Sequence, residues 1–84
     1  MPTLSRFYGI VIRMYLAGNE HNPPHIHAIY NEDVAAIDIM TGNVIVGSLP
    51  AHAMKLVQEW LSANRASLLE IWNTQEFQHI PPLA

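Results

Sequence analysis

The sequence contains no cysteine among its 84 residues. This absence excludes disulfide bonds, thiolate nucleophiles and zinc sites built from cysteine. A small domain without such cross-links is typical of a reducing compartment, so the cytoplasm is the expected location. Any chemistry at a functional site has to come from other side chains.

Positively charged residues are few and scattered. Seven acidic residues against four basic ones give a formal net charge of −3. The sequence has no basic stripe of the kind that binds a phosphate backbone, so nonspecific binding of nucleic acid near neutral pH is not expected. The sequence also has five histidines, one more than its lysines and arginines together, and histidine is the side chain that ordinarily titrates near neutrality.

Long hydrophobic runs and the common phosphate and nucleophile motifs are also missing. The apolar stretch over residues 7–17 is interrupted by Arg13, has no signal-peptide cleavage pattern and is shorter than the ~20 residues of a membrane span. No membrane partner is expected. Without a glycine-rich phosphate loop or a serine nucleophile elbow, kinase, nucleotidase and serine-hydrolase functions have no support.

What is present indicates a single α+β domain over residues 1–84. Alternating β-branched and aromatic residues separated by turn residues predict four strands, and apolar residues at helical spacing predict two helices. The expected strands are 6–16, 25–30, 34–40 and 44–47, and the expected helices are 50–63 and 65–78. Short connections imply a four-stranded antiparallel meander, with both C-terminal helices packed on one sheet face. One continuous helix through Asn64 remains an alternative.

Three of the five histidines lie within seven residues, in the segment His21-Asn22-Pro23-Pro24-His25-Ile26-His27. His25 and His27 are two apart on a predicted strand, so their side chains should share one face. The two prolines restrict the backbone before that strand, which would allow His21 to fold back toward the other two histidines. This segment is the predicted functional site.

Two kinds of chemistry suit this segment. His25 and His27 could supply a general base and a general acid, with Arg13 stabilising a developing anion, a set that suits cleavage of a phosphodiester such as RNA. Alternatively, the three histidines could bind a divalent metal, zinc or nickel, with Asp38 as a further ligand or an orienting carboxylate. Whether Asp38 shares their face depends on whether the turn before its strand has two or three residues. In a third interpretation the histidines are purely structural.

Several segments together resemble the bacterial Domain of Unknown Function 4160 family over nearly the whole chain. They are Met1-Pro2-Thr3-Leu4-Ser5-Arg6-Phe7-Tyr8-Gly9-Ile10, the histidine segment, Asp38-Ile39-Met40-Thr41-Gly42, Gly47-Ser48-Leu49-Pro50, Glu59-Trp60-Leu61 and Leu68-Leu69-Glu70-Ile71-Trp72. Where members often have an aspartate before the first histidine, this chain has Glu20. The resemblance implies a small bacterial protein encoded beside another small domain, an arrangement similar to a toxin–antitoxin pair. It implies no catalytic residues.

These observations lead to one main hypothesis and two alternatives. The main hypothesis is a toxin-like component of a two-gene module that binds the neighbouring gene's protein and acts on RNA through its histidines. The alternatives are a metal-binding hydrolase or sensor and a pure protein-interaction module. A homodimer that covers the second sheet face is compatible with all three.

Overall fold

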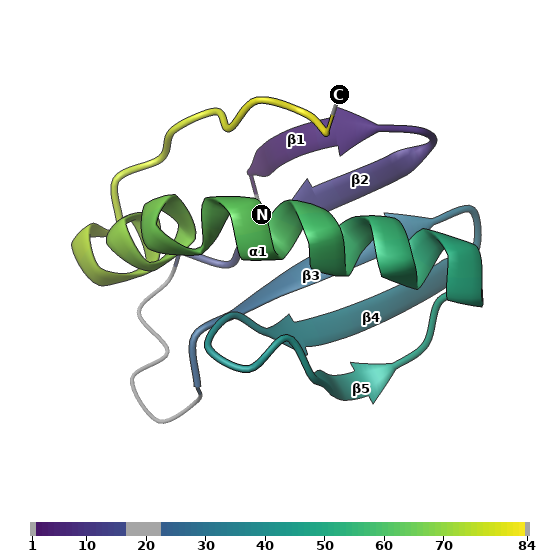
Figure 1. The fold of residues 1–84 in the computed structure, drawn as a ribbon. Helices are drawn as coiled ribbons and strands as arrows, with labels where there is room; N and C mark the ends of the chain where they lie inside the picture. Colours follow the sequence, from purple (N-terminus) through teal and green to yellow (C-terminus); the bar gives the residue numbers. More distant parts are fainter. Residues whose placement is uncertain (1, 17–22, 84) are drawn as a thin grey trace.

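The computed structural model describes residues 2–16 and 23–83, and it shows a five-stranded antiparallel sheet followed by one helix. The strands follow one another across the sheet in chain order (Figure 1). The elements are β1 (Thr3–Phe7), β2 (Ile10–Arg13), β3 (His25–Tyr30), β4 (Asp33–Asp38), β5 (Val44–Gly47) and α1 (Ala51–Thr74). The α+β class and the antiparallel meander are confirmed, whereas the number of strands and helices differs from the prediction.

The prediction of one strand over residues 6–16 was wrong, because this stretch contains a hairpin turn. Tyr8 and Gly9 both have positive φ, 49° and 80°, and Phe7 pairs with Ile10 across a two-residue connection. Positive φ at both central positions is the mark of a type I′ turn, which matches the twist of the strands it joins. The β-forming residues on either side hid this turn in the sequence pattern.

The prediction of two helices was also wrong, since α1 continues through Asn64. This residue has non-helical angles (φ −119°, ψ 15°), and its side-chain Nδ2 donates to the Trp60 carbonyl oxygen at 2.8 Å. The hydrogen bond satisfies a carbonyl within the helix, so Asn64 kinks α1 without ending it. The helix ends at Thr74, where Gln75 adopts a left-handed conformation and its N–H donates to Ile71.

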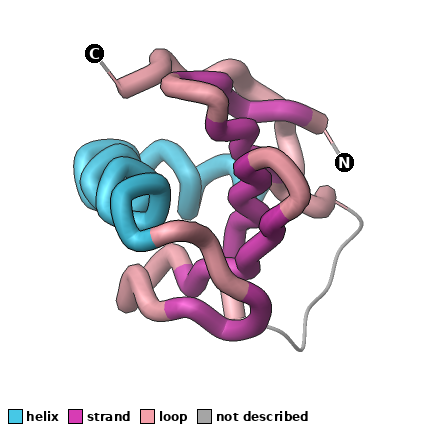
Figure 2. The backbone as a smooth tube through the Cα atoms, turned by 90° about the vertical axis from the view of Figure 1, so that its right-hand side faces the viewer, coloured by secondary structure: helices cyan, strands magenta, loops and turns pink. Residues whose placement is uncertain are grey.

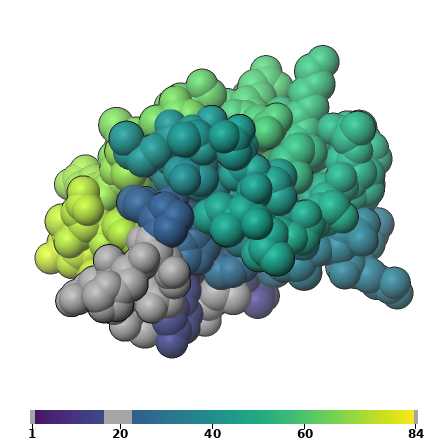
Figure 3. Space-filling model, turned by 90° about the horizontal axis from the view of Figure 1, so that it is seen from below, coloured from purple at the N-terminus to yellow at the C-terminus, as the bar shows by residue number. Residues whose placement is uncertain are grey.

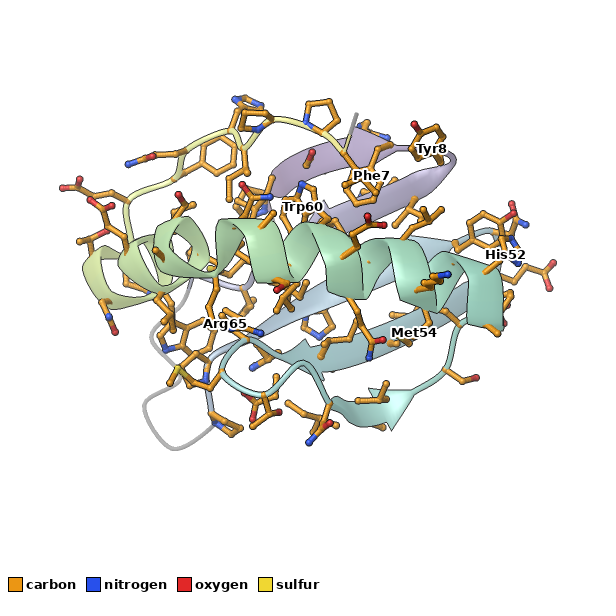
Figure 4. The ribbon with its side chains drawn as sticks, viewed as in Figure 1. Phe7, Tyr8, His52, Met54, Trp60 and Arg65 are labelled. Carbon is orange, nitrogen blue, oxygen red and sulfur yellow. The ribbon has the colours of Figure 1, made fainter. Side chains whose placement is uncertain are left out.

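α1 packs on one face of the sheet, and the described residues place no helix or strand on the other face (Figure 2). Trp60, which is fully buried, lies 5.6 Å from the ring of Phe7 and donates from Nε1 to the Pro81 carbonyl oxygen (Figure 4). The core therefore joins α1 to the β1–β2 hairpin and to the C-terminal tail. Its other large members are Leu4, Ile10, Ile12, Met14, Ile26, Ile37, Ile39, Val57, Leu61, Leu68 and Ile71.

Polar contacts attach the β4–β5 connection to α1. Arg65 donates from Nε to the Ile39 carbonyl oxygen at 2.7 Å, and Gln58 donates to the Gly42 carbonyl oxygen at 2.9 Å. At the end of β5, Gly47 has φ +83°, and a Cβ at this position would collide with the Val34 carbonyl oxygen. Position 47 therefore requires glycine, because only a residue without a Cβ lets β5 approach β4 this closely. Among the described residues, no helix combines the length and the hydrophobicity of a membrane span.

Candidate functional site

Strand pairing brings Arg13 beside His27. The two residues are cross-strand partners in the β2–β3 pair. Ile26 and Ala28, which alternate with the histidines on β3, are fully buried on the face toward α1. Because side chains alternate along a strand, His27 and Arg13 lie on the opposite face, here called the open face. His25 shares this alternation, but as the first residue of β3 it also contacts Trp72 of α1.

The imidazole of His25 is held on three sides. Its Nδ1 lies 2.9 Å from the Pro23 carbonyl oxygen. The centroid of its ring lies 5.1 Å from the ring centroid of His27 and 5.2 Å from that of Trp72. A carbonyl oxygen can only accept, so Nδ1 carries the proton in this hydrogen bond. The proline segment that stiffens the entry to β3 therefore also orients His25 and leaves Nε2 as the nitrogen that exchanges protons.

His27 and Arg13 differ from His25 because each has a shielded nitrogen without a partner. His27 Nδ1 and Arg13 Nε are buried and have no hydrogen bond within the described part of the chain. Burial lowers the pKa of His27 below its ordinary value, and the positive charge of His25 lowers it further. The neutral form of His27 is therefore favoured near pH 7.

Asp38 lies next to His25 but is used by a turn. The β3–β4 connection has two residues, so Asp38 pairs with His25 and lies on the open face. Its Oδ1 accepts hydrogen bonds from the backbone N–H groups of Met40, at 2.8 Å, and Thr41, at 3.3 Å. The carboxylate thus stabilises the β4–β5 turn, a contact typical of aspartate in turns.

The predicted metal site is only partly covered by the structure. His21 lies outside the described residues, while His25, His27 and Asp38 lie within them. In residues 2–16 and 23–83 no three histidine, aspartate or glutamate side chains are grouped as a metal would require. A metal site here would therefore need a ligand from outside the described residues, such as His21.

A pocket of about 210 Å³ adjoins the two histidines. Its lining is formed by Pro23, His25, His27, Ala36, Ile45 and Val46. Sequence reasoning did not connect β5 with the histidines, because only the pairing of β3 with β4 and of β4 with β5 brings Ile45 and Val46 to them. Trp72 was also missed as a site neighbour, since its helical spacing indicated only a core position.

The larger cavity and the other histidines lie elsewhere. A cavity of about 640 Å³ lies between β1 and the C-terminal tail, and the predicted site residues within the described chain, Arg13, His25, His27 and Asp38, do not line it. His79 lines that cavity. His52 lies at the start of α1, and its Nε2 is 3.3 Å from the hydroxyl oxygen of Tyr30 in β3 (Figure 4). We place the site at the smaller pocket because the paired histidines and the arginine are there.

Comparison with known proteins identifies a family but no characterised relative. No curated protein and no solved structure matches the chain significantly. A family model described as a domain of unknown function (DUF4160) matches residues 9–73, a range that includes the histidine segment, strands β2 to β5 and nearly all of α1. The match covers most of the chain and agrees with the resemblance seen in the sequence. The chain therefore belongs to the DUF4160 family.

Proposed function

We propose that the protein is the toxin-like component of a two-gene toxin–antitoxin-like module and that its open face acts on RNA through Arg13, His25 and His27. The observation that carries this proposal is the pairing of Arg13 with His27, each with a shielded nitrogen that lacks a hydrogen-bond partner in the described chain. A buried polar group without a partner needs an explanation, and a catalytic role is one of those that apply in proteins. A phosphodiester oxygen accepts hydrogen bonds from both guanidinium and imidazole groups.

The lowered pKa of His27 and the fixed orientation of His25 support a division of roles in general acid–base cleavage. His27, with its lowered pKa, would take the proton from the ribose 2′-hydroxyl, whose oxygen attacks phosphorus. His25, oriented through Nδ1, would give a proton from Nε2 to the 5′-oxygen as the P–O5′ bond breaks. Arg13 would stabilise the charge that develops on the phosphate. The products are a 2′,3′-cyclic phosphate and a free 5′-hydroxyl.

The charge of the molecule limits how RNA could bind. A net charge of −3 disfavours an extended electrostatic interface, so recognition would be local to the pocket beside the histidines. The protein encoded by the neighbouring gene would bind to the exposed sheet or helix surface and control access to the site.

The proposal is tested by expressing the chain with and without the neighbouring gene. Growth inhibition by the wild type should be lost in the His25→Ala/His27→Ala double variant, because both proton-transfer groups are removed. The matched control is His52→Ala/His79→Ala, which removes two exposed imidazoles outside the site and should remain inhibitory. Purified wild type should also leave cyclic phosphate ends on a short RNA.

Circular dichroism and thermal melting of each variant separate loss of the site from loss of the fold. If the folded His25→Ala/His27→Ala variant still inhibits growth and cleaves RNA, the site is wrong. A wild type that neither inhibits growth nor cleaves RNA contradicts the toxin-like function.

A metal-binding hydrolase or sensor is the second candidate, and the orientation of His25 favours it. Metal-binding histidines commonly donate their second ring N–H to a backbone carbonyl, as His25 Nδ1 does to Pro23. His27 and His21 would complete the ligands for zinc or nickel. Elemental analysis of tag-free protein should then give one metal per chain, lost in His25→Ala/His27→Ala. A metal-free protein with no thermal shift on adding zinc or nickel contradicts this alternative.

A further inference from the structure

The two edge strands of the sheet differ in whether another segment of the described chain lies beside them. Along β1, the C-terminal tail lies beside the strand, and the Ile80 N–H donates to the Leu4 carbonyl oxygen at 2.9 Å (Figure 1). β5 forms the other edge, and all four of its residues are exposed. No strand of the described chain pairs with the outer side of β5, so its backbone groups there are available to another strand.

The β5 edge is apolar and uncharged. Val44, Ile45 and Val46 are 42%, 48% and 66% exposed, and with Val34 and Met40 they account for five of the eight exposed large hydrophobic residues of the described chain. Their part of the chain faces the viewer in Figure 3. Residues 39–54 contain no aspartate, glutamate, lysine or arginine, and β5 contains no proline. The charges and prolines that usually protect edge strands from pairing are therefore missing.

The absence of charge indicates what can cover this edge. An extended nucleic-acid interface along this edge is disfavoured because the stretch has no lysine or arginine for the phosphates, and a charged protein segment would find no counter-charge. A neutral, apolar strand fits, and the β5 strand of a second copy has this chemistry. Two molecules that each carry a charge of −3 can approach here without bringing like charges together.

We propose that β5 pairs antiparallel with β5 of a second copy, which joins two five-stranded sheets in a two-fold symmetric dimer. Antiparallel pairing about Ile45 places Val44 of one protomer opposite Val46 of its partner, and the free N–H and C=O groups hydrogen-bond across the axis. Ile45 and Val46 also line the pocket beside His25 and His27, so the dimer contact borders that pocket. The proposal does not depend on what the pocket binds.

Sedimentation of the full chain over a wide concentration range tests the dimer. β5 is short and carries a bulge opposite Ala36 and Ile37, so we expect a weak dimer whose mass rises with concentration. Val46→Lys should remain monomeric with an unchanged circular dichroism spectrum. The matched control is Tyr8→Lys, because Tyr8 is 61% exposed but lies in the β1–β2 turn, so this variant should dimerise like the wild type (Figure 4). A monomeric wild type, a dimeric Val46→Lys or an equal effect of both variants overturns the proposal.

Cross-linking tests the geometry independently, because the natural chain has no cysteine. Ile45→Cys should form a covalent dimer on mild oxidation, since antiparallel pairing brings the two copies of this position together. Tyr8→Cys, at a position more exposed than Ile45 but in the β1–β2 turn, should stay largely monomeric. Equal cross-linking of the two variants, or none at position 45, contradicts β5 pairing even if Val46→Lys fails to fold.

Discussion

Two histidines on the same face of one strand have different surroundings. His25 has its Nδ1 hydrogen-bonded to a backbone carbonyl, whereas His27 Nδ1 is shielded and lacks a partner in the described chain. Burial and the charge of His25 lower the pKa of His27. A lowered histidine pKa means that the folded state binds its proton less readily than the unfolded state does.

This difference predicts how stability depends on pH. The contribution of His27 is greatest above the ordinary histidine pKa of 6.5, and it is lost as the pH falls from that value toward the lower pKa of the folded state. The free energy of unfolding should therefore decrease with acidification, and it should decrease less in His27→Gln. Urea denaturation at a series of pH values measures both. His79→Gln is the control, and identical pH dependence in wild type and His27→Gln contradicts the cause assigned here.

At the scale of elements, tight turns decide where strands begin and end. The β1–β2 hairpin turns at Tyr8 and Gly9, both with positive φ, although tyrosine is not a residue that favours this conformation. Tyr8 is 61% exposed and forms no part of the core, so burial of its side chain does little to offset the backbone cost. A single substitution at position 8 should therefore be able to stabilise the hairpin.

Replacing Tyr8 with asparagine should stabilise the hairpin. Asn-Gly is the favoured pair for a type I′ turn, and we expect a gain of about 0.5–1 kcal/mol. Tyr8→Val is the opposite control, because a β-branched residue adopts positive φ poorly and should destabilise the protein. Thermal melting gives the comparison. An Asn variant less stable than the wild type would show that the tyrosine side chain makes a contribution that its exposure does not reveal.

At the scale of the molecule, Trp60 connects parts of the chain that are distant in sequence. It projects from α1, packs on Phe7, donates to the Pro81 carbonyl oxygen and is fully buried. An 84-residue domain has a total stability of about 4–13 kcal/mol, from roughly 0.05–0.15 kcal/mol per residue. The free energy lost on truncating one such side chain is therefore comparable with the free energy of unfolding of the whole protein.

Truncation of Trp60 should bring the protein close to unfolding. We expect Trp60→Ala to cost about 3–5 kcal/mol through the cavity it leaves. Trp60→Phe keeps most of the ring and loses the hydrogen bond to Pro81, at a cost of about 1–3 kcal/mol. Equilibrium denaturation in urea measures both values. Equal losses in the two variants would mean that the hydrogen bond to the tail, rather than the buried volume, carries the effect.

Local patterns in the sequence determined the fold class and part of the site. Alternation and turn residues predicted the antiparallel meander and placed the strands at 25–30 and 44–47, where the structure has β3 and β5. The two-residue spacing of His25 and His27 was sufficient to put them on one face, and the helical spacing of Trp60 was sufficient to put it in the core. These features depend only on backbone periodicity and on burial of apolar side chains, which neighbouring residues specify.

Strand register and long-range packing, which only the tertiary structure supplies, decided the rest. The position of Arg13 beside His27 depends on how two strands pair across a connection that the sequence does not constrain. The same holds for Ile45 and Val46 at the histidine pocket and for Trp72 against His25, because each comes from an element distant in the chain. Asn64 could equally have ended a helix, whereas in the structure α1 resumes after a kink at this residue. Strand register and helix boundaries depend on the combined energy of all contacts between the paired elements, and a short stretch of sequence does not specify that energy.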